Sequence, residues 1–415
     1  GLEITDSTDS VGAEDRATVN IRDVSLTTSY AGGGKAIDLV MTDTSSVVPY
    51  GSSSTLTMTN VDIRGVDFYD GNTDYWTTGV YLEDTGEVQI DNCIILGNAG
   101  TAGVTGIYVV STDSNNIRFQ VSNTVIQFTE TAFRVTTNTG TTEGLWFTNC
   151  EFVAVKFGFV ADGSAGIIHG LSWTGGHIDA DQNCFIFGSA ARGSTSVQIH
   201  GAFLAIGDKW GGSDLENAYA VWFDEVHYAS IVGNRFLCSA GPVTSQACVA
   251  LGSCDGVIVA ANQFYRAGTG VFLYDNASGG DCQNCKVIGN YYDSTVSTPR
   301  SIAGATNQNW DAFLVDNGGN LTLPSFLAMA DGTGLLAGTT VGVTWPIAAN
   351  QKLGLWGVTP VIQPAHADQA ALGALATVSG SGADSDINDN FAAIETLLTA
   401  IRDATVAAGL MKGSA

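Results

Sequence analysis

A short alternation of apolar and polar residues recurs along the chain, with apolar side chains at its first, third and eighth places and Asn, Asp, Gly or Ala at the fifth. Clear copies are Leu56–Ile63, Val88–Ile95 and Leu145–Phe152. Because the local period is two and the apolar places hold many β-branched and aromatic residues, each copy predicts a strand and not a helix. Taking the fifth place as an anchor, the copies fall at Asp23, Asn60, Asn92, Asn123, Asn149, Gly175, Gly201, Gly233, Ala261 and Gly289.

The steps between successive anchors are 26 to 37 residues. Repeats of this length indicate stacked units that bury their apolar faces only against their neighbours. Asn, Asp and Gly tolerate left-handed backbone angles, so we expect the strand to turn sharply at each anchor. A second strand follows most anchors, as at Gly79–Leu82, Ala220–Phe223 and Gly270–Leu273. The pattern therefore predicts an all-β parallel β-helix of about ten rungs. A β-sandwich stays open as an alternative, whereas the repeats are too short for propeller blades.

The repeat ends near residue 318, which predicts three regions. Residues 1–318 form the β-helix, 319–379 a small C-terminal β-rich region, and 380–415 a flexible joint and a short C-terminal helix. In this last segment apolar residues recur with a/d-like spacing, a pattern typical of helices that associate. The predicted oligomerisation residues are Ile387, Phe391, Ile394, Leu398 and Ile401. Packing of this helix against its own rod is the alternative.

Composition favours an extracellular protein or the surface of a virion over an intracellular enzyme. Asp and Glu total 41 against 16 Lys and Arg, a formal net charge of −25, and only 14% of residues are charged. Such a charge disfavours nucleic acid and anionic membranes as partners. No apolar run approaches the roughly 18 residues of a membrane span, so no membrane insertion is expected. The first anchor arrives without a capping helix, and we expect that an N-terminal part is missing.

The eight cysteines divide by position. Cys93 and Cys150 directly follow their anchors, an inward position that favours small buried side chains. Cys254 and Cys282 each lie seven residues before an anchor, which places their Cα atoms about 4.8 Å apart on adjacent rungs, within reach of a disulfide. The second disulfide candidate is Cys238 with Cys248. Free thiols at these four positions are the alternative, and the single CxxC spacing does not suffice for a zinc site.

The segment from Lys352 to Pro364 reads Lys-Leu-Gly-Leu-Trp-Gly-Val-Thr-Pro-Val-Ile-Gln-Pro. Together with the repeat register and the terminal apolar helix, this string resembles the C-terminal portion of tailed-bacteriophage tailspikes and tail fibres. The resemblance implies a homotrimer of right-handed parallel β-helices, mounted on a virion, that recognises a host-surface glycan. It also implies contacts with other virion proteins through the missing N-terminal part.

Hydrolysis of a glycan requires two carboxylates about 5 to 9 Å apart across the scissile bond. Asp179 and Asp181 follow the copy anchored at Gly175, and Asp224 with Glu225 closes the second strand after the Gly201 anchor. These four acids are the catalytic candidates. With 41 acids in the chain, however, neighbouring carboxylates also arise by chance, as solvated turn residues.

The glycan-binding candidates gather near the same copies. They are Asp208 and Trp210 in a glycine-rich loop, and Trp222 and His227 around the next strand. If Val221 and Phe223 face the core, strand alternation turns Trp222 to solvent, where its ring could stack on a sugar. The five histidines show no ligand spacing, so neither a metal nor another cofactor is expected.

Three hypotheses remain for the function. The chain is a phage spike or fibre that binds a host polysaccharide, the same object with glycosidase activity, or a purely structural filament protein. Binding to surface glycans separates the first from the third, and release of new reducing ends identifies the second.

Overall fold

The structure is a computed structural model. It describes residues 1–7, 18–42, 55–70, 73–98, 103–112, 116–138, 141–162, 167–188, 193–207, 218–238, 247–274, 282–303, 314–315, 321–322, 352–353, 361–362 and 383–407. The chain divides into two compact units, Gly1–Leu327 and Ala328–Ala415. Each unit is described by itself.

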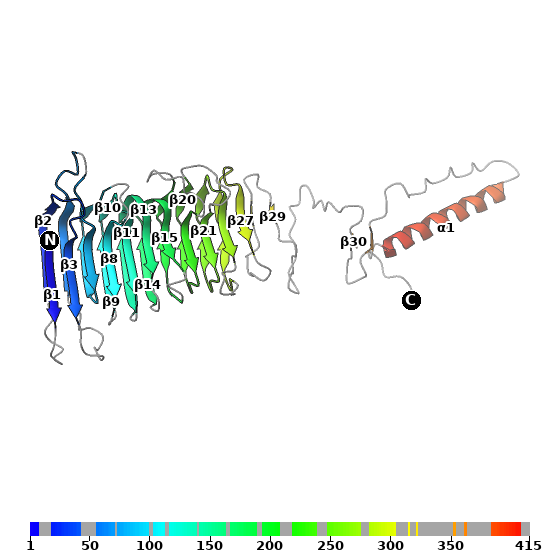
Figure 1. Ribbon diagram of the computed structural model, residues 1–415. Helices are drawn as coiled ribbons and strands as arrows, with labels where there is room; N and C mark the ends of the chain where they lie inside the picture. The colour runs from blue at the N-terminus through cyan, green and yellow to red at the C-terminus, as the bar shows by residue number, and fades with distance from the viewer. Residues whose placement is uncertain are drawn as a thin grey trace. The chain divides into compact units, whose positions relative to one another are not determined.

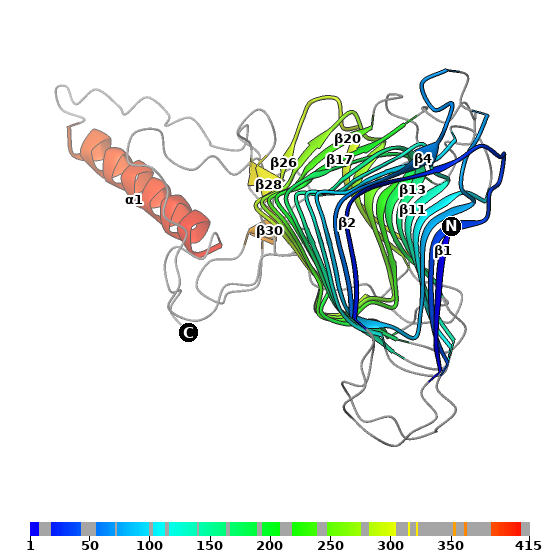
Figure 2. The same cartoon turned by 90° about the vertical axis from the view of Figure 1, so that its left-hand side faces the viewer.

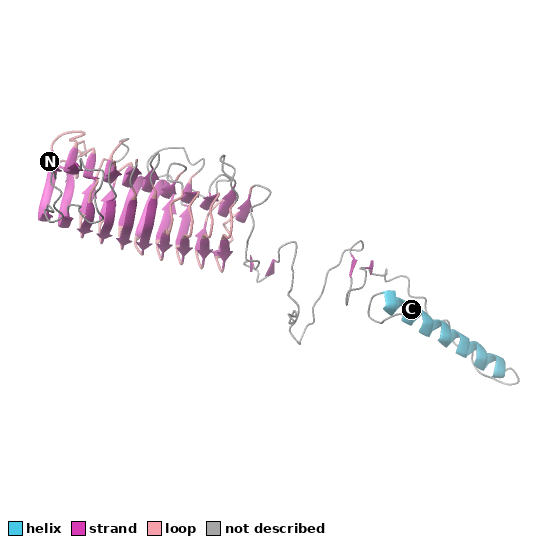
Figure 3. Cartoon of the chain, turned by 90° about the horizontal axis from the view of Figure 1, so that it is seen from below, coloured by secondary structure: helices cyan, strands magenta, loops and turns pink. Residues whose placement is uncertain are grey.

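The first unit is a parallel β-solenoid whose strands form three stacked faces (Figures 1 and 2). Every pairing between its 27 solenoid strands is parallel, and each strand pairs with the equivalent strand one turn away (Figure 3). The first face consists of β2 (Thr18–Thr28), β4 (Thr55–Gly65), β6 (Gly86–Asp91), β9 (Asn116–Ser122), β12 (Thr142–Thr148), β14 (Ile168–Thr174), β16 (Gln198–His200), β19 (Ser230–Val232), β22 (Ile258–Ala260) and β25 (Lys286–Ile288).

The second face begins with the ends of β2 and β4, which pair beyond the anchors Asp23 and Asn60. It continues through β7 (Ile94–Leu96), β10 (Val125–Gln127), the first parts of β13 (Glu151–Asp162) and β15 (His177–Phe187), β17 (Phe203–Ile206), β20 (Arg235–Cys238), β23 (Gln263–Tyr265) and β26 (Tyr291–Tyr292). The third face comprises β1 (Leu2–Ser7), β3 (Lys35–Thr42), β5 (Thr78–Glu83), β8 (Thr105–Ser111), β11 (Thr131–Thr137), the second parts of β13 and β15, β18 (Tyr219–Asp224), β21 (Ala247–Gly252), β24 (Thr269–Tyr274) and β27 (Thr298–Ile302).

Apolar side chains from successive turns form one continuous column in the interior. Met58 pairs with Ile90, Ile90 with Val121, and Val121 with Phe147. The column continues through Trp173 to Ile199, and all of these side chains are at most 1% exposed. The apolar places of the sequence repeat therefore stack in vertical register, and the predicted all-β parallel solenoid with a C-terminal helix is confirmed.

All ten anchors adopt the left-handed backbone conformation that the sequence predicts. Their φ angles run from 49° at Asn123 to 69° at Gly233. The early anchors are also joined by side-chain hydrogen bonds, because Asn92 Nδ2 donates to Asn60 Oδ1 over 2.6 Å and Asn60 Nδ2 to Asp23 Oδ1 over 2.8 Å. Left-handed turns at a fixed place in each repeat keep the first and second faces in register along the solenoid.

Ala261 is the anchor least suited to its conformation, with φ at 54°. A left-handed residue with a Cβ costs about 1–2 kcal/mol, and glycine avoids this cost while losing about 0.5–1 kcal/mol in chain entropy. Ala261→Gly should therefore raise the free energy of unfolding by about 0.5–1 kcal/mol, measured by denaturant unfolding. The reverse change at Gly233, where nothing lies within 4 Å of the added Cβ, is the matched control and should destabilise. Stabilisation by both changes would contradict the role of the anchors.

Polar residues replace the apolar ones directly after the last three anchors. Asn234 Nδ2 donates to the Ile199 carbonyl over 2.8 Å, and Asn262 Nδ2 to the Ile231 carbonyl over 2.8 Å. The oxygen Oδ1 of Asn262 accepts from the backbone N–H of Asn234 at 2.9 Å. Buried amides are stable only when so paired. These asparagine hydrogen bonds support the turns at Gly233, Ala261 and Gly289, anchors whose own side chains cannot form hydrogen bonds.

Beyond the solenoid, the described secondary structure consists of two small antiparallel pairs and a helix. The pairs are β28 (Leu314–Val315) with β29 (Leu321–Thr322), and β30 (Lys352–Leu353) with β31 (Val361–Ile362). The helix α1 spans Ala383–Ala407. The predicted division at residues 318 and 379 remains a prediction, as does the role of most of the segment Lys352–Pro364, which lies outside the described residues.

Candidate functional site

The outward side of the third face carries the predicted Trp222. On β18 the side chains of Val221 and Phe223 are fully buried, and Trp222 between them is partly exposed. Strand pairing aligns Trp222 with Ala250 on β21 and then with Phe272 on β24. The neighbouring outward row aligns Asp224, Gly252 and Tyr274. The partly exposed side chains here thus come from β18 and β24, two turns apart, with the buried Ala250 and Gly252 of β21 between them.

Four aromatic rings gather at this place, which we call the third-face platform: Tyr219, Trp222, Phe272 and Tyr274. The indole Nε1 of Trp222 donates a hydrogen bond of 2.5 Å to the Tyr274 hydroxyl. The rings of Phe272 and Tyr274 are stacked with centroids 5.4 Å apart, and those of Tyr219 and Trp222 are 6.1 Å apart. All four side chains are partly exposed. The platform is therefore a fixed aromatic surface that spans two solenoid steps.

Small residues on β21 make this arrangement possible. Ala250 and Gly252 lie between the strands of Trp222 and Tyr274. A Cβ atom at Gly252 would come within 2.5 Å of the Tyr274 ring carbon Cζ. The tyrosine ring therefore lies directly on the backbone of β21 and reaches the tryptophan of the turn beyond. Burial raises the pKa of Tyr274 above its ordinary value, with a further contribution from the nearby Asp224 carboxylate, so the hydroxyl stays protonated.

Gly252→Ala should displace the Tyr274 ring and lower the free energy of unfolding by about 1–3 kcal/mol, the usual cost of overpacking. A denaturant titration measures this loss. In a Tyr274→Ala background the same change should cost much less, because the three atoms nearest to the added methyl group all belong to the Tyr274 side chain. An equal loss in both backgrounds would contradict the close packing of the ring on Gly252.

The four predicted catalytic acids do not converge on one place. Asp179 and Asp181 are 5% exposed and lie near the start of the long strand β15, whereas Asp224 is 6% exposed and ends β18. On β15, Phe187 pairs with Phe223, the residue directly before Asp224. Between Asp181 and Phe187 the strand β15 passes from the second face to the third. Asp179 therefore pairs on the second face, whereas Asp224 ends a strand of the third face. Glu225 follows Asp224 in a left-handed turn with φ of 58°.

The remaining glycan-binding candidates are placed unevenly. His227 lies at the corner after the platform, in a row of single bridges that joins it to Thr195 and Asp255. Its ring is 6.4 Å from that of Tyr228, which is 68% exposed. Asp208 and Trp210 lie outside the described residues. Of the predicted set, the structure therefore brings Trp222 and Asp224 to the platform and His227 to its edge.

Neither predicted disulfide is formed in the structure, where all eight cysteines are free and buried. Cys238 Sγ and Cys248 Sγ lie 3.9 Å apart, well beyond the ~2.05 Å of an S–S bond. The thiols of Cys254 and Cys282 instead donate to the carbonyls of Gly252 and Leu251, each over 3.3 Å. Both predicted pairs therefore bring their thiols close together without joining them. Burial also raises the pKa of Cys248 and Cys254, which keeps both protonated.

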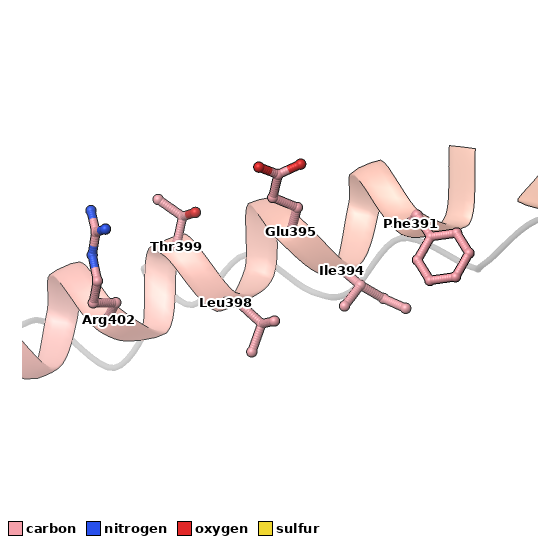
Figure 4. Close-up of a pocket in the computed structure, with 6 residues that line it drawn as sticks. All are labelled: Phe391, Ile394, Glu395, Leu398, Thr399 and Arg402. Carbon is pink, nitrogen blue, oxygen red and sulfur yellow. The ribbon is translucent and has the colours of Figure 1, made fainter. Parts of the chain in front are cut away.

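The helix α1 presents a second candidate surface (Figure 4). The five predicted oligomerisation residues are all exposed, from 39% at Ile387 to 66% at Phe391, and follow one another at steps of four and three residues. In Figure 4 the side chains of Phe391, Ile394 and Leu398 form one row along the helix and those of Glu395, Thr399 and Arg402 a second row beside it, and all six line one pocket. An exposed apolar stripe with this spacing is typical of helices that pack against copies of themselves.

Sequence reasoning missed three members of the platform: Tyr219, Phe272 and Tyr274. Phe272 was within reach, because Gly270–Leu273 alternates as Ala220–Phe223 does, and the same rule that turns Trp222 outward applies to it. The Tyr274 contact has no such signal. It depends on the small side chains of β21, which let one ring span two turns.

The described strands define the chain as a parallel β-solenoid. Among solved structures it is similar to the crystal structure of the Dettilon tailspike protein, with a TM-score of 0.28 and 14% sequence identity over 69% of this chain. The chain spans 60% of the length of that protein. No protein-family model and no curated protein matches the sequence. Within the described residues, no helix is long and apolar enough to cross a membrane, and no cluster of His, Cys, Asp or Glu suits a metal ion.

Proposed function

We propose that this chain is the receptor-binding part of a phage tailspike or fibre that recognises a host-surface polysaccharide as a homotrimer. The observation that carries the proposal is the third-face platform. Its four rings are partly exposed and held in fixed positions by stacking and by the hydrogen bond between Trp222 and Tyr274. Sugars present C–H groups on their ring faces, and flat aromatic surfaces bind such faces. On this proposal the protein belongs to a virion appendage outside the cell.

The exposed stripe of α1 supports the oligomeric part of the proposal. Most of the stability of a helix in a protein comes from packing of its apolar face, and association would bury the apolar face of α1. Residues of this stripe, such as Phe391 at 66% and Leu398 at 60% exposure, are costly to leave in solvent. Contacts with other virion proteins belong to this proposal as well.

Trp222→Ala should weaken binding to the polysaccharide by about tenfold or more, the loss expected when a central aromatic anchor is removed. Isothermal titration calorimetry of the intact protein with polysaccharide fragments measures it. The matched control is Trp146→Ala, because Trp146 is 41% exposed on the first face, away from the platform. Equal binding by the Trp222→Ala variant and the native protein would remove the platform from the receptor site.

Hydrolysis of the bound polysaccharide is the second candidate function. Asp224 favours it, because this carboxylate lies beside the platform and is only 6% exposed. The placement of Asp179 and Asp224 on different faces disfavours a mechanism that uses both sites. Incubation with the polysaccharide should release new reducing ends at a rate that falls in an Asp224→Asn variant. Cleavage at an unchanged rate in that variant would exclude Asp224 as the acid, and a lack of cleavage leaves binding as the function.

A further inference from the structure

The second face carries a stripe of aromatic and cationic side chains that the third-face platform does not use. We call it the second-face stripe: His177, Phe203, Arg235, Tyr265 and Tyr291. His177, Phe203 and Arg235 stand in one outward row on consecutive turns, and Tyr265 and Tyr291 lie on the next two turns. Their rings are in contact range, with centroids 4.9 Å apart for His177 and Phe203 and 6.2 Å apart for Tyr265 and Tyr291.

Arg235 is the centre of this stripe. Its guanidinium carbon Cζ lies 5.7 Å from the ring centroid of Phe203 and 4.9 Å from that of Tyr265, so the group is held between two rings. Stacking occupies the flat faces of a guanidinium, whereas its N–H donors point outward in its own plane. Arg235 is exposed to solvent. The two rings therefore restrain the position of the guanidinium, whose donors remain available to a ligand.

Several other cations of the described solenoid are paired with carboxylates. Arg118 pairs with Glu87 at 3.1 Å, Arg134 with Asp162 at 2.5 Å, and Lys35 with Asp38 at 3.0 Å. For Arg235 no carboxylate partner is found in the part of the chain that the structure describes. The acid in its own row is Glu151, three strands away and about 14 Å distant. A positive charge thus stands on this face of a protein whose net charge is −25.

We infer that the second-face stripe binds a sugar ring that carries a carboxylate, such as a uronic or sialic acid residue of an acidic glycan. A planar guanidinium matches a carboxylate through two parallel hydrogen bonds. The exposed ring of Tyr291, at 46%, and the partly exposed rings of Phe203 and Tyr265 offer stacking surfaces for the sugar. At physiological ionic strength charges beyond about 8 Å are largely screened, so the local cation outweighs the distant acids.

The fold favours a sugar over an acidic peptide at this stripe. Peptides that bind to sheets commonly pair with an exposed strand edge. The strands β17, β20 and β23 pair with neighbours on both sides, so their backbone groups are already used. Recognition here depends on side chains alone, and a row of rings around one restrained guanidinium suits a carboxylated sugar. The site lies on another face than the platform and does not rest on the proposed receptor function.

An array of uronic- and sialic-acid oligosaccharides, each printed beside its carboxyl-reduced counterpart, tests the inference with the full chain. The native protein should bind at least one acidic glycan about tenfold or more above its reduced form, as expected for charge-assisted hydrogen bonds. Arg235→Gln should abolish this difference, and Arg235→Lys, which keeps the charge but loses the planar fork, should restore only part of it. Arg118→Gln, which removes an exposed arginine on the first face, is the matched control.

The outcomes separate this inference from the proposed function. Trp222→Ala should leave acidic-glycan binding unchanged if the two sites are independent. Equal signals for acidic and reduced glycans, or signals that Arg235→Gln leaves intact, would overturn the inference while the platform still stands. Equal competition by a polyglutamate peptide would overturn the assignment to a sugar. Unchanged thermal melting of the variants excludes unfolding as the cause, since Arg235 is exposed.

Discussion

On the proposed homotrimer, replacing Ile394 and Leu398 by aspartate should convert the trimer to a monomer. Both side chains belong to the apolar stripe of α1, at 40% and 60% exposure, and association would bury them in a shared seam. Two charges in that seam would remain unpaired away from water, a cost of several kcal/mol per chain. Sedimentation equilibrium should report about three times 43.0 kDa for the native protein and 43.0 kDa for the variant.

The control for this experiment lies on the opposite side of the same helix. Thr396→Asp adds the same kind of charge at an exposed position two residues from both Ile394 and Leu398, which is the far side of a helix with about 3.6 residues per turn. This variant should stay trimeric. A native protein that sediments as a monomer would refute the proposed trimer, and a double variant that remains trimeric would show that the stripe of α1 does not hold the subunits together.

Trp173→Ala should lower the free energy of unfolding by about 3–5 kcal/mol, the range measured for large aromatic residues in cores. Trp173 is fully buried in the middle of the solenoid, with ring centroids of Phe147, Phe152 and Phe185 at 5.2, 5.0 and 5.4 Å. Its indole Nε1 also donates to the carbonyl of Gly175, an anchor, over 2.7 Å. Loss of this ring would leave a cavity at the centre of an aromatic cluster that spans several turns.

Denaturant unfolding followed by circular dichroism measures this loss. Trp146→Ala serves again as the control, because the Trp146 side chain is 41% exposed and points away from the core. Trp146 lies on β12, which pairs with β14, the strand of Trp173. Its removal should cost less than about 1 kcal/mol. Similar losses for the two tryptophans would contradict the inward and outward assignment on the first face.

The sequence predicts the solenoid well because its signals are local and repeated. Each anchor carries a residue that tolerates the left-handed backbone, and the ten positions chosen from the pattern all adopt it, Ala261 included. Alternation likewise predicts that Val221 and Phe223 face the core and that Trp222 faces out. Period and alternation fix which side of a strand each residue occupies, and stacking then follows from the burial of the apolar side.

The site is less predictable because it depends on contacts between turns. The platform requires that β21 offer Ala250 and Gly252 where Tyr274 crosses, and no local pattern marks such a coincidence. The two predicted pairs of catalytic acids do not meet, because β15 is long and passes from the second face to the third. Asp179 and Asp181 lie near its beginning, whereas Asp224 lies beside its end. Cys254 and Cys282 lie on adjacent turns as the spacing predicts, yet their thiols donate to backbone carbonyls.

The receptor role of the platform is tested most directly by a crystal structure of the protein with an oligosaccharide from the surface polysaccharide of the host. The sugar rings are expected to lie on Trp222 and Tyr274, with hydroxyl groups toward Asp224. A sugar bound elsewhere on the solenoid, with Trp222 and Tyr274 bare, would contradict the assignment of the third-face platform as the receptor site.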